Sequence, residues 1–296
     1  MLHQPPSGHE PLPTRWTLAG LLAATSDWLK LGSLPGISQL LHRLRIGWKR
    51  GRYHVHSPDP DYVAKLRAIK RQVLQTGQDP PLVLFTDEFT LSRHPSLSWA
   101  YEQQGGHQPL AELGYQGNYT WRIAAALNPY TGQVSYFQAW VIDVPRMIRF
   151  YHRLHQTYPD RHLLLVQDNW PLHAHPDVRA ALQPQTFPFP LHLPPSWPTE
   201  PTRPIPATPL PIQLLFLPTY ASWTNPIEKL WRLLRQEVLH LHRYADAWPA
   251  LKLRVWDFLD QFQSGSTDLL RYVGLSDLHK LYQSLFPPGS LLDAVP

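Results

Sequence analysis

Three short apolar runs stand out in the hydrophobic pattern of the chain. They are residues 81–88 (PLVLFTDE), 161–169 (RHLLLVQDN) and 212–218 (IQLLFLP). Apolar runs of this length, bounded by polar or proline residues, are typical of strands that are buried on both faces. They therefore predict inner strands of one sheet, and the first two of these strands end in acidic residues.

The surrounding pattern predicts the rest of an α/β fold. Further strands are expected at 97–105 and within 120–141, where NPYTGQ forms the turn of a hairpin. Amphipathic spacing predicts helices at 144–159, at 175–183 and from Asn225 to about His242. The order is three strands, helix, strand, helix, strand, helix, which indicates a mixed central sheet with flanking helices.

The N-terminal part has a different pattern. Residues 14–24 read as a short helix capped by Thr14, and a second helix is expected from about Ser38 to Leu44. Two short helices around a glycine-containing turn suit a helix-turn-helix, whose second helix enters the major groove of DNA. Residues 59–76 predict a longer linking helix.

The positive charge of the chain is concentrated in this part. Residues 1–80 contain 11 Lys/Arg and 5 Asp/Glu, although the whole chain has a net charge of only +5. A local basic patch is typical of proteins that bind polyanions, and a solvated basic surface is the alternative. Segment 42–54 (HRLRIGWKRGRYH) provides the candidate contacts to DNA phosphates: Arg43, Arg45, Lys49, Arg50 and Arg52.

Composition narrows the chemistry. The chain has 296 residues and no cysteine, which excludes disulfides, thiolate metal sites and a cysteine nucleophile. There is no signal-peptide pattern and no apolar run near the roughly 20 residues that span a bilayer, so we expect a soluble, cytoplasmic protein without a membrane partner. Residues 184–211 contain 11 of the 33 prolines and predict an exposed, polyproline-like insertion.

Three acids follow the three apolar runs. Asp87 comes after LVLFT, Asp168 after LLLVQ, and the third run leads to Glu228 at the start of the next helix. Sites in α/β sheets form beyond the carboxyl ends of the strands, and carboxylate oxygens are the ligands that Mg²⁺ or Mn²⁺ prefers. Two such ions catalyse in-line phosphoryl transfer, so the acids predict a two-metal site.

Each acid also has a purely structural interpretation. Glu88 suits the role of ligand as well as Asp87 does, and Asp168 with Asn169 could form a turn. Glu228 could be only the acid of a capping box, with Asn225 as the cap. The tryptophans at positions 99, 121, 170 and 231 are more typical of a core than of a platform for DNA bases.

Three motifs resemble a known family. LFTDEFTLS, LLLVQDNWPLHAH and LFLPTYASWTNPIEKLWRLLR resemble the catalytic blocks of IS630 transposases, which belong with the Tc1/mariner group in the DDE superfamily. In the second block His173 follows Asp168 by five residues, and in the third Trp231 follows Glu228 by three. The resemblance covers about residues 14–260.

The resemblance implies an RNase H-like fold and cut-and-paste DNA transposition. By position it makes Asp87, Asp168 and Glu228 the catalytic acids and metal ligands, with Glu88, Asn169, His173 and Asn225 around them. It also implies two Mg²⁺ or Mn²⁺ ions, terminal inverted repeats and target DNA as partners, and a homodimer on paired ends. A prokaryotic insertion sequence would encode such a protein, which would act in the cytoplasm at the nucleoid.

The chain departs from the family pattern in two places. Asp168 and Glu228 are 60 residues apart, more than is usual, and the proline-rich insertion accounts for the excess. The N-terminal part has room for one helix-turn-helix where the family has two. The organisation expected is therefore a DNA-binding region (1–58), a linker helix (59–80), a catalytic domain (81–260) and a helical tail (261–296). A non-catalytic DNA-binding remnant and a host nuclease of the same fold are the alternatives.

Overall fold

The chain divides into two compact units, residues 1–55 and 56–296. The computed structural model describes residues 15–48, 56–75, 79–191 and 193–285. In the N-terminal unit, α1 (Leu18–Thr25) packs against α2 (Leu34–Arg43). This pair of helices matches the element pattern expected there.

Both N-terminal helices begin at positions other than those predicted. Helix α1 starts after Thr17, whose hydroxyl accepts a hydrogen bond from the backbone N–H of Gly20, so the expected cap at Thr14 is wrong. Helix α2 starts four residues before Ser38, because Ser33 caps it and its first turn contains Pro35. Position 14 and the basic segment 49–54 lie outside the described residues.

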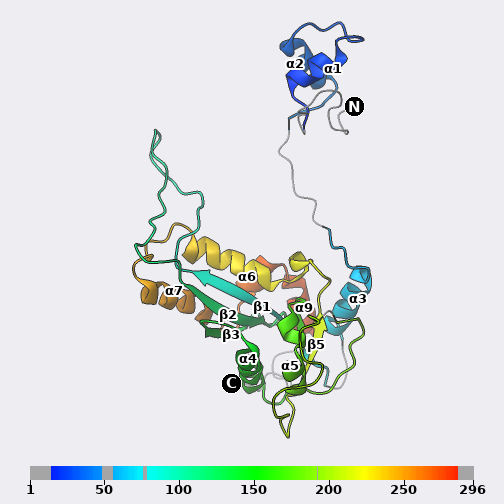
Figure 1. The fold of residues 1–296 in the computed structure, drawn as a ribbon, viewed down its shortest axis with the longest axis vertical. Helices are drawn as coiled ribbons and strands as arrows, with labels where there is room; N and C mark the ends of the chain where they lie inside the picture. Colours follow the sequence, from blue (N-terminus) through cyan, green and yellow to red (C-terminus); the bar gives the residue numbers. More distant parts are fainter. Residues whose placement is uncertain (1–14, 49–55, 76–78, 192, 286–296) are drawn as a thin grey trace. The chain divides into compact units, whose positions relative to one another are not determined.

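A five-stranded mixed sheet forms the centre of the second unit (Figure 1). Its strands lie in the order β3-β2-β1-β4-β5. The antiparallel pairs are β1 with β2 and β2 with β3, whereas β4 runs parallel to both β1 and β5. The strands are β1 (Leu82–Ser92), β2 (Thr120–Leu127), β3 (Val134–Ala139), β4 (Leu163–Gln167) and β5 (Ile212–Phe216). The mixed α/β sheet predicted from the apolar runs is confirmed.

Helices cover both faces of this sheet (Figure 1). Helices α4 (Val144–Thr157) and α5 (Pro176–Ala180) pack into one hydrophobic core. Helices α6 (Ile227–Leu234), α7 (Trp248–Asp260) and α8 (Thr267–Val273) pack into a second core on the opposite face. Helix α6 continues into a π-helical turn, Arg235–Leu239, so the single helix predicted to His242 is interrupted.

Strand β1 is longer than predicted, and this changes the setting of its acids. The strand continues through Asp87 and Glu88 because Phe89 and Leu91 maintain an alternating buried pattern and pair with β2. The two acids therefore lie within the strand instead of after it. Since side chains of a strand alternate between its faces, Asp87 and Glu88 project to opposite sides of the sheet.

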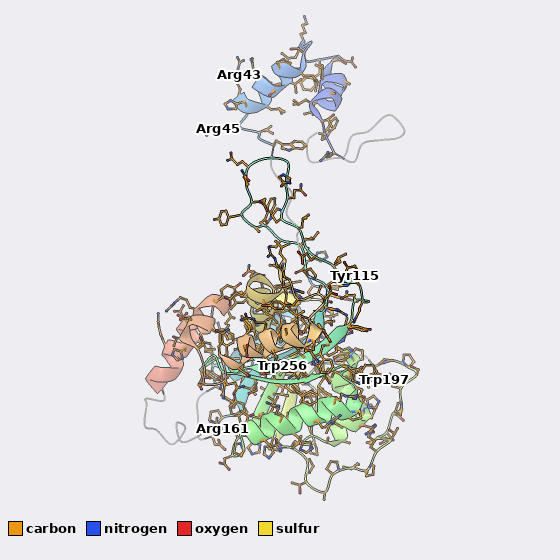
Figure 2. All side chains as sticks on the ribbon, turned by 90° about the vertical axis from the view of Figure 1, so that its left-hand side faces the viewer. Arg43, Arg45, Tyr115, Arg161, Trp197 and Trp256 are labelled. Atoms are coloured by element: carbon orange, nitrogen blue, oxygen red, sulfur yellow. The ribbon has the colours of Figure 1, made fainter. Side chains whose placement is uncertain are left out.

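The strand predicted at 97–105 is absent, and the connection from β1 to β2 is a long loop that extends away from the sheet (Figure 1). Its apolar side chains face solvent: Trp99 is 99% exposed, contrary to the expected core position, and Tyr115 is fully exposed on the same loop (Figure 2). Buried Arg93 holds the base of the loop by donating to the Ala245 carbonyl and to Gln116 Oε1.

The segment predicted as a linking helix belongs to the second unit. Helix α3 (Tyr62–Val73) begins later than residue 59 because the preceding residues form a buried polar anchor. Lys65 Nζ lies 2.7 Å from Asp59 Oδ2, and the same oxygen accepts a hydrogen bond from the backbone N–H of Thr219 at 2.7 Å. This anchor joins the segment before α3 to the loop that leads into α6.

The proline-rich insertion is only partly exposed. The described residues of 184–211 contain no helix and no strand, as predicted. However, Phe187, Leu191, Leu193 and Trp197 pack against the first core, so the prediction of an exposed insertion is only partly right. Figure 2 shows Trp197 on the side of the domain that this insertion covers.

The C-terminal segment contributes to the domain as well. Phe262, Leu269 and Val273 are buried in the second core, and α9 (Ser276–Leu285) follows α8. None of the helices in the described parts of the chain is long and apolar enough to cross a membrane.

Candidate active site

The register of the parallel strands brings two of the predicted acids together. Phe85 of β1 pairs with Val166 of β4. Continuing this register by two residues places Asp87 of β1 beside Asp168, which directly follows β4. The carboxyl ends of parallel strands meet at the same edge of the sheet, so the two acids share one site although they are 81 residues apart in the sequence.

Asp87 faces α6 and is mostly surrounded by protein. Its Oδ2 accepts a hydrogen bond from the indole Nε1 of Trp231 at 2.8 Å. Burial, together with the negative charges of Glu228, Glu88 and Asp168, raises the pKa of Asp87 to about 8, although the hydrogen bond from Trp231 opposes this increase. The charges of these four acids therefore act on one another in a partly desolvated pocket.

Glu228 reaches the same site from the first turn of α6. Burial raises its pKa, the guanidinium of Arg235 lowers it, and the charge of Asp168 raises it again. The charge of Glu228 therefore interacts with the charges of both Asp87 and Asp168. The three acids predicted from the sequence are therefore coupled electrostatically, from β1, from the residue after β4 and from the first turn of α6.

Glu88 lies on the other face of β1, beside His173. The His173 Nε2 atom lies 3.4 Å from Glu88 Oε2 and 3.3 Å from Asp168 Oδ1. His173 is buried, Glu88 is nearly so, and the side chain of Asp168 is half-exposed. Neither contact has the full geometry of a hydrogen bond from Nε2, so both are short-range ion pairs.

The two carboxylates keep His173 protonated. Burial lowers the pKa of His173, but the charge of Glu88 and interactions with Asp168 outweigh burial and raise it to about 10. Burial alone would raise the pKa of Asp168. His173 and the backbone N–H of Trp170, which donates to Asp168 Oδ1 at 2.8 Å, outweigh burial and hold this pKa below its ordinary value. Asp168 is therefore ionised and oriented from two sides.

Two asparagines connect the strands and loops of the site. The Nδ2 of Asn169 donates to the carbonyl of Leu217 at 2.7 Å, which holds the loop after β4 against the end of β5. The Nδ2 of Asn225 donates to the carbonyl of Thr86 at 2.9 Å. The predicted cap is therefore wrong: Asn225 is buried and faces β1, and no side chain among the described residues caps α6.

Among the described residues, the group whose ligand atoms all lie within 4.8 Å of one another is Glu88, Asp168 and His173, a spacing that suits a metal ion. A protonated imidazole has no lone pair to offer, however, so this group serves as an ion-pair triad as long as His173 keeps its proton. Sequence reasoning missed the contact between Trp231 and Asp87. The only signal was the spacing of three residues that puts Trp231 and Glu228 on one face of a helix.

The candidate DNA-binding residues are only partly described. Arg43 lies in the last turn of α2 and Arg45 just beyond it with a positive φ of 56°, and both side chains are exposed (Figure 2). Lys49, Arg50 and Arg52 lie outside the described residues. Within the second unit, Arg232 and Arg235 of the α6 region are exposed and close enough to Glu228 to lower its pKa.

The strand order and the position of the acids define an RNase H-like α/β domain, and comparisons with known proteins agree. The sequence pattern of the family described as DDE superfamily endonuclease matches residues 82–252. The chain therefore belongs to this family. The matched range contains all three acids, and the resemblance to IS630 and Tc1/mariner transposases is confirmed.

A curated relative comes from an insertion element. It is the "Insertion element IS630 uncharacterized 39 kDa protein" of Shigella sonnei, 23% identical over 208 residues, which are 70% of this chain and 53% of that protein. The chain thus spans about half the length of this relative.

Solved structures with the same fold are complexes of the Mos1 transposase. The "Mos1 transposase paired-end complex with left transposon end" has a TM-score of 0.55 at 15% identity, covering 94% of this chain and 80% of that chain. The "Mos1 mariner paired end complex with Mn" has a TM-score of 0.56 at 15% identity, covering 93% and 80%. Because the sequence identity is only 15%, these two similarities establish the fold alone.

Proposed function

We propose that this chain is a divalent-metal-dependent DNA transposase that cuts DNA at the ends of an insertion element and joins the ends to target DNA. The observation that carries the proposal is the convergence of Asp87, Asp168 and Glu228 on one edge of an RNase H-like sheet. Membership of the DDE superfamily endonuclease family supports the same chemistry.

The three acids fit a divalent cation. Their charges raise the pKa of Asp87, and Glu228 and Asp168 also repel each other, so a cation placed among them would relieve an electrostatic cost of the fold. All donors are carboxylate oxygens, which suits Mg²⁺ or Mn²⁺. Asp87, Asp168 and Glu228 would together hold a pair of such ions. When bound, such ions activate the attacking oxygen and stabilise the leaving oxygen of a phosphodiester.

The surrounding residues hold these acids in place. In this assignment, protonated His173 bridges Glu88 and Asp168 and fixes the half-exposed carboxylate of Asp168. Asn169 and Asn225 fix the loop after β4 and the start of α6. Mutation of residues that orient a metal ligand typically costs 10- to 100-fold in affinity or activity.

DNA is the proposed substrate of both units. Arg43 and Arg45 on the N-terminal unit, together with Lys49, Arg50 and Arg52, would contact phosphates at the element ends, and Arg232 and Arg235 would contact the strand near Glu228. Each phosphate contact releases counterions, so binding should weaken steeply with salt. A homodimer on paired ends, acting in the cytoplasm at the nucleoid, completes the proposal.

A cleavage assay tests the function. The purified chain is incubated with duplexes carrying the sequences that flank its reading frame, with Mg²⁺, Mn²⁺ or EDTA. We expect metal-dependent nicking at the element boundary, lost in Asp168→Ala and in Glu228→Gln. Cleavage that survives Asp168→Ala would remove the catalytic assignment. Specific binding without cleavage would favour a DNA-binding remnant. Cleavage that shows no preference for these ends would favour a host nuclease.

A further inference from the structure

A buried tryptophan lies directly behind the first acid of the site. Trp231 is 1% exposed, and its Nε1 donates to Asp87 Oδ2 at 2.8 Å. An indole N–H donates and never accepts, and it does not change its charge with pH. It therefore fixes one oxygen of Asp87 without neutralising the carboxylate.

The ring of Trp231 is held so that the direction of this N–H is fixed. It stacks on Phe89, with ring centroids 5.1 Å apart and an angle of 24° between the ring planes. Phe89 follows Asp87 by two residues in β1 and so lies on the same face of the strand. The guanidinium of Arg235 lies 4.9 Å from the Phe89 ring. The strand that carries the acid thus also carries the surface that orients its donor.

Helix α6 carries both this donor and the third acid. Glu228 and Trp231 are three residues apart and lie on neighbouring positions of one helix face. Asn225, just before the helix, donates to the carbonyl of Thr86, and Trp231 donates to the next residue of β1, Asp87. Two hydrogen bonds to consecutive strand residues therefore fix the start of α6, and with it Glu228, relative to Asp87.

We propose that Trp231 is a positioning residue for the metal site: its indole N–H holds Asp87 Oδ2 so that the remaining lone pairs of the carboxylate face the cation. This inference rests on the proposed function, because it assumes that Asp87 binds the ion. It assigns to Trp231 a role that core packing alone does not require, since stacking on Phe89 does not depend on the indole N–H.

The test removes the N–H and keeps the ring. One variant is Trp231→Phe, and a second carries β-(3-benzothienyl)alanine at position 231, where sulfur replaces the N–H in a ring of nearly the same shape. The matched control is Trp121→Phe, which also loses an indole hydrogen bond, from Nε1 to Gln138 Oε1, on the far part of β2. Asp87→Ala serves as the reference for a lost ligand.

Two readouts separate positioning from packing. The first is the dissociation constant for Mn²⁺, measured from the electron paramagnetic resonance signal of the free ion, without DNA. The second is the dependence of the cleavage rate on Mn²⁺ concentration. We expect both Trp231 variants to bind Mn²⁺ about 10- to 100-fold more weakly than the unmodified chain. A high Mn²⁺ concentration should restore part of the cleavage rate of the two Trp231 variants but none of the cleavage rate of Asp87→Ala. The control Trp121→Phe should have the same Mn²⁺ affinity and cleavage rate as the unmodified chain.

The outcomes distinguish the two levels of the proposal. If Asp87→Ala loses Mn²⁺ binding but the folded benzothienyl variant binds it as the unmodified chain does, Trp231 only packs and the positioning role is wrong. If Asp87→Ala itself retains Mn²⁺ binding and cleavage, the proposed site fails. Should Trp231→Phe not fold, the benzothienyl variant, which keeps the size of the ring, decides the question.

Discussion

Asp87 and Glu88 are neighbours in one strand, yet the two faces of the sheet give them different surroundings. Glu88 has a cation within the fold, because His173 lies 3.4 Å from its carboxylate and is kept protonated by it. Asp87 has a neutral donor, Trp231, and otherwise faces other acids, whose charges help burial to raise its pKa to about 8. The carboxylate of Glu88 thus has a cation directly beside it within the fold, whereas the carboxylate of Asp87 does not.

On the proposed function, this difference separates the residues that would bind a cation from the residues that would hold them in place. A carboxylate already paired with an internal cation has less to gain from a metal ion, whereas a group of mutually repelling carboxylates gains most. Asp168 lies between the two faces, with His173 on one side and Asp87 and Glu228 on the other. We therefore propose metal binding on the face of the sheet that α6 covers, and orientation of Asp168 by the residues on the face that α4 covers.

The largest expected effect is on cleavage by the two neighbouring variants Asp87→Asn and Glu88→Gln. Loss of a metal ligand removes several kcal/mol of transition-state stabilisation, so Asp87→Asn should lower the rate on the order of 1000-fold or more. Glu88→Gln should lower it by about 10- to 100-fold, since it only loosens Asp168. Single-turnover cleavage rates at saturating Mg²⁺ measure both, and equal losses would remove the distinction between the faces.

Removal of His173 should mainly affect stability. His173→Ala leaves Glu88 nearly buried without its cation, and breaking a buried pair in this way costs about 3 kcal/mol. Urea unfolding measures the loss. The double variant His173→Ala/Glu88→Gln should recover much of it, because no buried charge is left behind. A double variant no more stable than His173→Ala would show that packing, rather than charge, explains the loss.

Asp59 and Lys65 provide a second internally paired acid, outside the group of three acids. Burial alone would raise the pKa of Asp59. Hydrogen bonds from Lys65 and from the backbone N–H of Thr219 outweigh burial, and the pKa is lowered to about 2. A lowered pKa stabilises the fold above the ordinary value of 3.8, and this contribution is lost as the pH falls through about 2. The stability difference between the unmodified chain and Asp59→Asn should therefore be about 2 kcal/mol near pH 6 and shrink below pH 4. A stability difference between the two chains that does not change with pH would contradict this role of the Asp59 carboxylate.

The smallest expected effect is a gain, not a loss, in the stability of the fold. Without metal, Glu228→Gln should stabilise the chain by less than about 1 kcal/mol, because it removes repulsion from a site that solvent partly screens. Glu237→Gln, at an exposed position in the turn after α6, is the control and should change nothing. Thermal unfolding in EDTA measures the gain, and Mg²⁺ should then stabilise the unmodified chain but not Glu228→Gln. Destabilisation in EDTA would favour a purely structural role of Glu228.

The three buried strands, the hairpin and the convergence of the acids could be predicted from the sequence. Continuous apolar runs identify inner strands, and acids at the ends of parallel strands must meet. The extent of β1 was missed because the run of apolar residues stops at Asp87, while the alternation of Phe89 and Leu91 continues the strand. The strand expected at 97–105 was wrong because its apolar residues face solvent instead of a neighbouring strand.

The partners of the acids could not be predicted, because they depend on tertiary contacts. Asn225 has the composition of a helix cap, but its amide reaches Thr86, which is 139 residues earlier in the chain. Trp231 has the spacing of a core residue, and nothing in the sequence indicates that its N–H meets Asp87. Local patterns specify where a side chain points along its own element, whereas the group that it meets is set by how the elements pack.

Titration of Mn²⁺ into the unmodified chain, Asp87→Asn and Glu88→Gln tests the central claim most directly. The free ion is followed by electron paramagnetic resonance, and no DNA is present. The α6-face site predicts that Asp87→Asn loses binding, while Glu88→Gln keeps it within about 10- to 100-fold. The reverse result, in which Glu88→Gln loses binding and Asp87→Asn keeps it, would place the metal among Glu88, Asp168 and His173 and contradict the account.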